Sequence, residues 1–249
     1  MEMPAITMAD IRTTTATISL EPIRLRVAPL IALNLTLALA MLAVGFPAIV
    51  SNALRLPSEV VIRAIRDGQP VSKADDDEAV DRLESAAAFS NAARADLAIA
   101  LLAGKAPPSS AADRVLADHA ARQLSRYLDA APDDAFAWAN LAQAEMRRGT
   151  AGAAALPFKM SIEFSPQSEA SILWRCDFGI DIYAALDDEG KALVAKEFQT
   201  AMDPSLDSSI SEQVVQIVQR KNAITLARAL LANNADASRK FESLLAAKR

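Results

Sequence analysis

The sequence predicts an all-α fold of short antiparallel helix pairs, preceded by a single membrane-spanning helix. Of its 249 residues 52% are hydrophobic but only 5% are aromatic, so the apolar content is mostly alanine, leucine, valine and isoleucine. Alanine and leucine are strong helix formers. The seven glycines are few for tight-turned sheets or phosphate-binding loops, which need glycine where the backbone takes a positive φ or approaches a ligand.

The N-terminal part is predicted to be a tail over residues 1–26 followed by a membrane anchor over residues 27–54. The anchor segment has 28 residues without a charge, and about 20 apolar residues in a helix cross a bilayer core. A buried core helix is one alternative, but such helices rarely stay apolar on every face for this length. A cleaved signal peptide is the other, with Ser51-Asn52-Ala53 as its cleavage site. The run exceeds the ~7–15 residues of a signal core, which favours an uncleaved anchor.

Flanking charge leaves the direction of insertion nearly balanced. Arginines precede the anchor at Arg12, Arg24 and Arg26, and follow it at Arg55, Arg63 and Arg66. A short segment before a lone N-terminal span most often stays in the cytoplasm. We therefore expect a single-pass membrane protein whose C-terminal domain lies outside the cytoplasm.

A juxtamembrane helix and linker are predicted over residues 55–71, with Val60, Val61, Ala64 and Ile65 on one apolar face. A helical domain is predicted over residues 72–249. Ser72 is suited to cap its first helix, and the acidic run Asp75 to Glu78 favours the positive end of that helix. A calcium site is the alternative role for this run, but a calcium loop needs a glycine turn that is missing here.

Short breaking segments divide the remaining chain into helices of about 10–15 residues, the pattern of antiparallel pairs. Residues 72–104 are expected to form one long helix, or two helices that abut near Ser90-Asn91, and residues 106–110 a loop. Further breaks are expected at 132–134, 149–152, 165–167, 187–190, 203–204 and 233–234. The last three helices are predicted near 209–221, 224–233 and 235–247.

One stretch, residues 135–168, carries a set of residues at fixed spacings. They are Trp138, Leu141, Ala142, Ala154, Phe158 and Pro166, with Gly149 at the turn between two helices. This set resembles the tetratricopeptide repeat, whose pattern spans about 34 residues. Ala120, Leu124 and Pro132 repeat part of the frame one unit earlier, whereas Glu145 departs from it because an aromatic residue normally packs there. Elsewhere the frame is weak, so an irregular helical bundle is the alternative fold.

The resemblance also implies a concave surface lined by the first helix of each unit. In the matched unit the lining residues would be Phe136, Ala139, Asn140, Gln143 and Arg147. Repeats that clamp a partner's terminal carboxylate use lysine and asparagine at such positions, and Phe136 and Ala139 do not fit that set. A groove for an apolar or helical segment of a partner protein is expected instead.

Residues for catalysis, cofactors or metals form no recognisable set. His119, the one histidine, has no nucleophile beside it in sequence, and Cys176, the one cysteine, lacks the partners of a zinc site. The sequence contains neither G-x-S-x-G nor a complete phosphate-binding loop. The net charge of −5 argues against nucleic acid as a partner. We expect no enzyme activity, no cofactor and no metal; an enzyme with an unrecognised site is the alternative.

The expected function is that of a membrane-anchored adaptor or scaffold for protein–protein interaction in the bacterial cell envelope. An accessory subunit of an envelope polysaccharide biosynthesis, export or secretion machine is the alternative. Partners would be another protein, the membrane through residues 27–54, and, as a further alternative, other copies of the chain.

Overall fold

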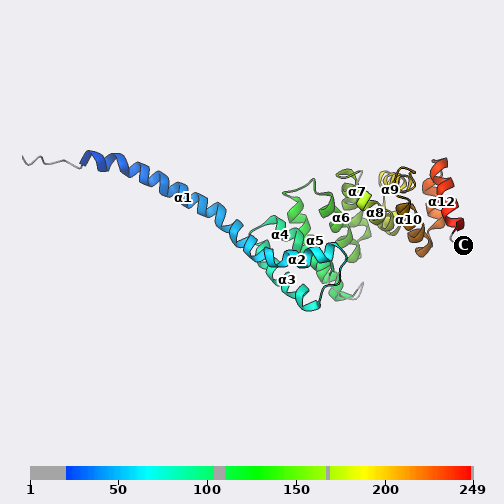
Figure 1. Ribbon diagram of the computed structural model, residues 1–249, viewed down its shortest axis with the longest axis horizontal. Coiled ribbons are helices and arrows are strands. Elements are labelled where there is room, and N and C mark those ends of the chain that lie inside the picture. The colour runs from blue at the N-terminus through cyan, green and yellow to red at the C-terminus, as the bar shows by residue number, and fades with distance from the viewer. Residues whose placement is uncertain (1–20, 104–109, 167–168, 248–249) are drawn as a thin grey trace, which may run out of the picture. The chain divides into compact units, whose positions relative to one another are not determined.

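A computed structural model describes residues 21–103, 110–166 and 169–247 (Figure 1). The part of the tail before residue 21 and most of the loop predicted at 106–110 lie outside these ranges. Every regular element in the described ranges is helical, and neighbouring helices pack in pairs, so the all-α class is confirmed. The chain divides into two compact units, residues 1–47 and 48–249.

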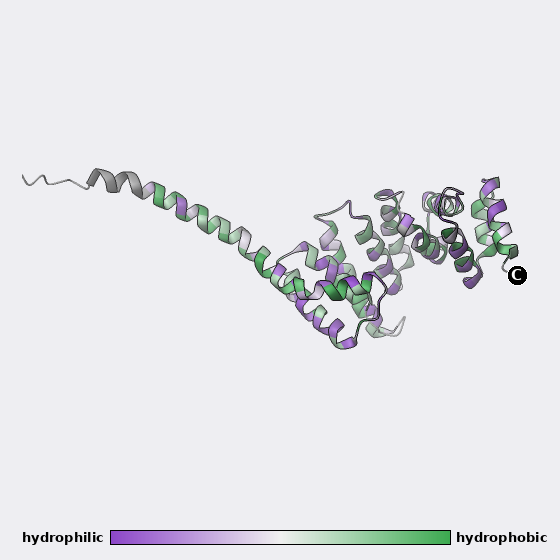
Figure 2. Cartoon of the chain, viewed as in Figure 1, coloured by the Kyte–Doolittle hydropathy of each residue, from purple (hydrophilic) through white to green (hydrophobic). Residues whose placement is uncertain are grey.

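Helix α1 (Glu21–Arg55) contains nearly all the described residues of the first unit. It begins inside the range predicted as tail. Its leucines, isoleucine and methionine from Leu30 to Leu42 are all exposed, and hydrophobic residues occur on every side of it (Figure 2). By length and composition the helix that contains this segment is able to cross a membrane, as an anchor or as a signal sequence.

The last turns of α1 belong to the second unit. The Ser51 side chain is buried and its hydroxyl donates to the carbonyl oxygen of Ala86 at 3.4 Å. Leu54 packs at the edge of the N-terminal core, and Arg55 forms an ion pair with the buried Asp96. The helix end is therefore held by a hydrogen bond, an apolar contact and an ion pair.

A short 3₁₀ turn, η1 (Leu56–Ser58), leads into α2 (Glu59–Arg66). Ile62 is buried in the core, whereas Val60, which belongs to the predicted apolar face, is exposed. Gly68 then ends the segment with a positive φ of 67°.

Helices α3 (Lys73–Ala87), α4 (Asn91–Ala103) and α5 (Ala111–Leu128) follow. Ser72 caps α3 by accepting the N–H of Asp75 at 3.2 Å, which confirms the predicted helix start. Ser110 caps α5 through the N–H of Asp113. Of the two alternatives for this stretch, one long helix or two that abut near Ser90, the structure has the second, because α3 and α4 are separate helices.

Helices α6 (Ala135–Arg147) and α7 (Ala151–Glu163) form the pair that the repeat spacing predicts. Gly149 lies in the connection with a φ of 86°, a conformation that glycine adopts without strain. The two helices pack closely because Ala142 and Ala154 are small and fully buried. Phe158 of α7 points toward α8, and the centre of its ring lies 5.7 Å from the centre of the Phe178 ring.

The C-terminal part contains α8 (Glu169–Ile182), the 3₁₀ turn η2 (Tyr183–Ala185), α9 (Asp188–Ala201), α10 (Ser208–Arg220), α11 (Ile224–Leu231) and α12 (Ala235–Ala247). The predicted break at 187–190 is wrong over most of its length. Asp187 caps α9, and Gly190 lies within the first turn, where it is buried. The acidic run fits a turn, but carboxylates are also stabilising at a helix N-terminus, where they interact with the positive end of the helix dipole.

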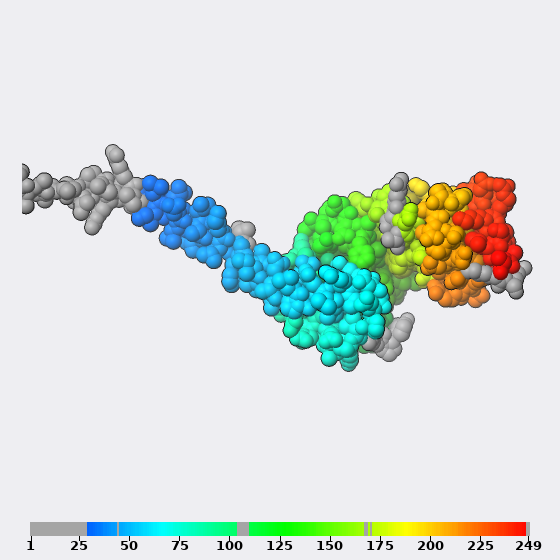
Figure 3. All heavy atoms as spheres, in the orientation of Figure 1, coloured from blue at the N-terminus to red at the C-terminus, as the bar shows by residue number. Residues whose placement is uncertain are grey.

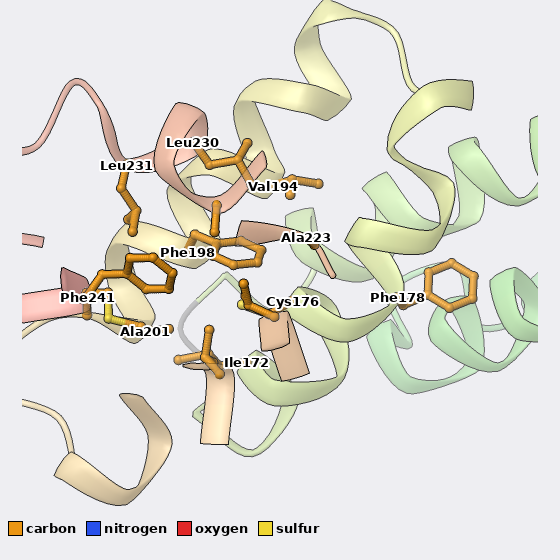
Figure 4. Packing of buried hydrophobic residues seen from close by; sticks show 14 of the residues in the cluster. Ile172, Cys176, Phe178, Val194, Phe198, Ala201, Ala223, Leu230, Leu231 and Phe241 are labelled. Atoms are coloured by element: carbon orange, nitrogen blue, oxygen red, sulfur yellow. The ribbon is translucent and has the colours of Figure 1, made fainter. Parts of the chain in front are cut away.

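Two hydrophobic cores hold the second unit together. The N-terminal core is formed by α2 to α6, and the C-terminal core by α6 to α12 (Figure 4). Helix α6 contributes to both, with Leu141 in the first and Ala142 in the second. In Figure 3 the atoms of this unit form a continuous surface on the face that is drawn.

One charged pair lies inside the C-terminal core. Arg175 of α8 and Glu197 of α9 are both buried, with Arg175 Nη1 3.6 Å from Glu197 Oε1. Arg175 Nη2 also donates to the carbonyl oxygens of Ser161 at 2.6 Å and Ser165 at 2.9 Å, at the end of α7. This side chain therefore joins three helices. Burial lowers the pKa of Arg175 and raises the pKa of Glu197, because both lose water.

Candidate functional site

The start of α6 determines which of its residues face outward. Asp134 Oδ1 accepts the backbone N–H groups of Phe136 at 2.9 Å and Ala137 at 3.0 Å, which fixes the first turn. Ala137 and Leu141 then point into the N-terminal core. Phe136 is left 55% exposed, and Asn140, one turn later, donates its side-chain amide to the carbonyl oxygen of Phe136 at 2.8 Å.

Phe136 and Asn140 line a hollow of about 140 Å³ in the second unit. The Phe136 ring lies 5.7 Å from the guanidinium carbon of Arg66, a cation–π distance. The wall is built by the end of α1 together with α2, α4, α5 and α6. The remaining lining residues are Arg55, Ala92, Ala95, Asp96, Ile99, Leu124, Tyr127, Asp134 and Ala137.

A buried carboxylate holds the two arginines of this hollow in place. Arg55 Nε donates to Asp96 Oδ2 at 2.6 Å, and Arg66 Nη2 donates to Asp96 Oδ1 at 3.0 Å. Asp96 is buried, and a buried carboxylate is stable only when it is paired. The ion pairs of Asp96 with Arg55 and Arg66 thus connect α1, α2 and α4. They also hold the Arg66 side chain, which is about half exposed, beside Phe136.

Tyr127 supplies a second polar group to the hollow. Its hydroxyl donates to Asp134 Oδ2 at 2.8 Å. This hydrogen bond, with a smaller effect of burial, raises the pKa of Tyr127 to about 12. The phenol therefore stays protonated at physiological pH and acts as a fixed donor. An aromatic ring beside fixed polar groups is suited to binding a partner's side chains.

The other residues expected in the groove lie elsewhere. Ala139 and Gln143 are half-buried and do not line the hollow. Arg147 forms an ion pair with the buried Asp113, Nε to Oδ1 2.9 Å, and donates to the carbonyl oxygen of Leu102. Its guanidinium therefore connects α6 with α4 and α5. The structure thus brings together Phe136 and Asn140 from the expected set, and separates them from the other three.

The residues that the repeat resemblance assigns to the core take different positions. Leu141, Ala142, Ala154 and Phe158 are buried. Trp138 is only half-buried, and its indole N–H donates to the carbonyl oxygen of Pro132 at 2.7 Å. Pro166 follows the end of α7 and is exposed.

Sequence reasoning missed Asp96, Arg55, Arg66 and Tyr127 as members of one site. Asp96 is the one charge in the segment from Ala95 to Ala103, and a lone carboxylate in an apolar helix is a usable sign of a buried ion pair. Its partners are not readable from the sequence, because they lie 41 and 30 residues earlier.

Among the described residues, no three His, Cys, Asp or Glu side chains are grouped as a metal site. His119 lies 3.0 Å from the amide of Gln123 and 3.7 Å from the Glu84 carboxylate, on α5. Cys176 is fully buried, and the loss of water raises the pKa of its thiol well above the ordinary value. A thiol in that state is a poor nucleophile.

Comparisons with protein-family models, with curated proteins and with solved structures give no match for this chain.

Proposed function

We propose that the chain is a membrane-anchored helical adaptor that binds a partner protein at the hollow beside Phe136. The observation that carries this proposal is the exposed Phe136 ring next to the Arg66 guanidinium, both of which line that hollow. Aromatic and arginine side chains at partly enclosed positions are the commonest anchors of protein interfaces. The pairing of helices around Gly149 supports a tetratricopeptide-like unit as the frame of the site.

The helical structure of residues 51–53 and the burial of Ser51 favour an uncleaved anchor over a cleaved signal peptide. These residues continue the regular helix α1, and Ser51 is buried in the second unit. Cleavage there would remove Ser51 and its hydrogen bond to Ala86. We place the helical domain in the periplasm of a bacterial envelope, and a reporter fused after Arg249 that is active only outside the cytoplasm tests this placement.

Photo-crosslinking tests the binding site. A photoreactive amino acid at position 136 of the full-length chain, expressed in its own host, should capture one recurrent partner. Position 89 is the matched control, since Phe89 is 49% exposed but does not line the hollow. Capture of the same proteins in the same amounts at both positions would contradict the assignment.

Substitution provides the second test. Phe136→Ala should reduce capture of that partner by an affinity tag on the chain, and Phe89→Ala should not. Because Phe136 is exposed, its removal should leave the melting temperature nearly unchanged. Arg147 is unsuited to this test, because its pairing with Asp113 makes any substitution a test of folding. Undiminished capture by Phe136→Ala would remove the hollow from the interface.

A further inference from the structure

The segment after α1 has one face that the protein itself does not cover. On one side Ser58 and Ile62 are buried against the domain. On the other side Leu56 is 60% exposed and Val60 is 76% exposed, and Pro57 is exposed between them. Arg63 follows one helical turn after Val60 and is exposed as well. We call these four residues, Leu56, Pro57, Val60 and Arg63, the outer face.

The exposed apolar residues of the outer face are clustered, unlike the isolated apolar residues of an ordinary protein surface. A single exposed leucine is ordinary, but here two large apolar side chains lie one helical turn apart with an exposed proline beside them. The domain does bury one apolar residue of the same short helix, Ile62, in its core. Leaving Leu56 and Val60 in water therefore points to contact with something outside the chain.

The charges near the outer face differ in how they are used. Arg55 and Arg66 both hold the buried Asp96. Within the described ranges, no carboxylate lies at ion-pair distance from Arg63. Arg63 also lines a hollow of about 220 Å³ with Arg55, Arg66, Glu59, Ile62, Asp67 and Asp96. Next to the apolar residues, the face therefore carries a guanidinium available to an anion.

Chain length places this face close to the membrane that α1 is proposed to cross. Residues 30–50 form a helix about 31 Å long at 1.5 Å per residue, the thickness of a bilayer core. Leu56 is six residues after Val50, which is at most about 9 Å of helix. The headgroup layer on each side of the core is roughly 5–8 Å thick. Leu56 thus lies at the outer edge of that layer on an upright helix and closer to the core on a tilted one, and η1 begins there.

We propose that the outer face lies in the headgroup layer, with Leu56 and Val60 against the acyl boundary and the Arg63 guanidinium donating hydrogen bonds to a lipid phosphate. This inference rests on the proposed membrane anchoring. An amphipathic segment with aliphatic residues on one side and arginine at its border is the usual form of an interfacial contact. Anionic lipids would strengthen the contact through Arg63.

Depth-dependent quenching in reconstituted vesicles tests the proposal on the full-length chain. Single cysteines replace Leu39 in the apolar helix, Val60 on the outer face, and Val115 on α5, which is 67% exposed and serves as the control. Each is labelled with a fluorophore under native conditions. Cys176 should stay unlabelled because it is fully buried, and the unsubstituted chain checks this. The vesicles contain lipids that carry a nitroxide at the headgroup or deep in the acyl chain.

The expected result is several-fold stronger quenching by headgroup nitroxides at position 60 than at position 115, with deep nitroxides acting on position 39. Equal quenching at 60 and 115, with position 39 quenched, overturns the inference while the anchor stands. An unquenched position 39 overturns the anchor itself and this inference with it.

A charge variant supplies an independent readout. In vesicles containing an anionic lipid, Arg63→Gln should shift the balance between docked and free outer face by roughly fivefold, the effect of one basic residue near an anionic surface. Arg114→Gln, an exposed arginine on α5, is the matched control and should have no effect. Identical quenching at position 60 for the original chain and Arg63→Gln overturns the assigned role of Arg63.

Discussion

Replacing Arg175 with methionine should destabilise the second unit by about 3–5 kcal/mol. The change removes a cation that lies 3.6 Å from the buried Glu197 carboxylate, and taking one partner from a buried ion pair typically costs this much. It also removes the donors to Ser161 and Ser165, worth about 1 kcal/mol each when both groups are otherwise dry. Methionine is shorter than arginine, so it retains the apolar part of the side chain but leaves a small cavity at the guanidinium position, which adds to the loss.

The double variant Arg175→Met, Glu197→Leu separates these contributions. With the carboxylate gone, the cost of an unpaired buried charge disappears, and the remaining loss should be about 2 kcal/mol from the two carbonyls. The double variant should therefore be about 1–3 kcal/mol more stable than Arg175→Met alone, a difference above the error of such measurements.

Urea unfolding in detergent micelles measures these differences. Trp174 is adjacent in sequence and stacks on Phe178 with ring centres 4.9 Å apart, so its fluorescence reports loss of this core. The second tryptophan, Trp138, lies outside it and reports the N-terminal core. Equal destabilisation by the single and double variants would refute the ion pair as the cause. An unchanged midpoint for Arg175→Met would refute the burial of the pair.

The same pair predicts a pH effect with a definite sign. Burial raises the pKa of Glu197 above its ordinary value of 4.5, so the folded state binds this proton more tightly than the unfolded state. The contribution of Glu197 to stability is therefore greatest below pH 4.5 and falls as the pH rises through the raised value. Other carboxylates lose favourable contacts in acid, so the quantity to measure is the difference between the original chain and Glu197→Gln. A difference that does not change across this range would contradict the shift.

Three smaller changes test the site and its frame. Asp96→Asn should cost about 3 kcal/mol in urea unfolding, because it leaves Arg55 without its carboxylate; a loss below about 1 kcal/mol would contradict the pairing. Tyr127→Phe should cost about 1–2 kcal/mol through the lost bond to Asp134, and ultraviolet titration of the intact chain should show one phenol ionising near pH 12. Gly149→Ala should cost about 1 kcal/mol in thermal melts because its φ is positive, unless the turn changes conformation.

Much of the helical pattern is readable from the sequence because it depends on local chemistry. The Ser72 cap, the separation of α3 from α4 and the helix pair around Gly149 follow from residues a few positions apart. Gly190 was misread for the same reason: an acidic run followed by glycine fits both a turn and a first helical turn, and only packing against Leu186 decides between them.

The candidate site was only half predictable, because helix rotation and distant pairs determine it. Phe136 and Asn140 share a face by spacing alone, and the structure leaves both on the hollow. Arg147 has the same spacing, but it is drawn inward by Asp113, 34 residues earlier. Spacing also predicts an apolar face that includes Val60, but it does not say what that face contacts; the structure leaves Val60 exposed and buries Ile62. Only the neighbouring helices select Ile62.

Because α6 belongs to both cores, the protein has one helix common to two cooperative units. Leu141 anchors it in the N-terminal core and Ala142 in the C-terminal core. Native proteins open locally, one cooperative segment at a time, so opening of a single core is a normal state of the native ensemble. Fraying that begins at α12 can pass through α8 while α6 stays folded on α4 and α5. The hollow beside Phe136 would then outlast the loss of half the domain.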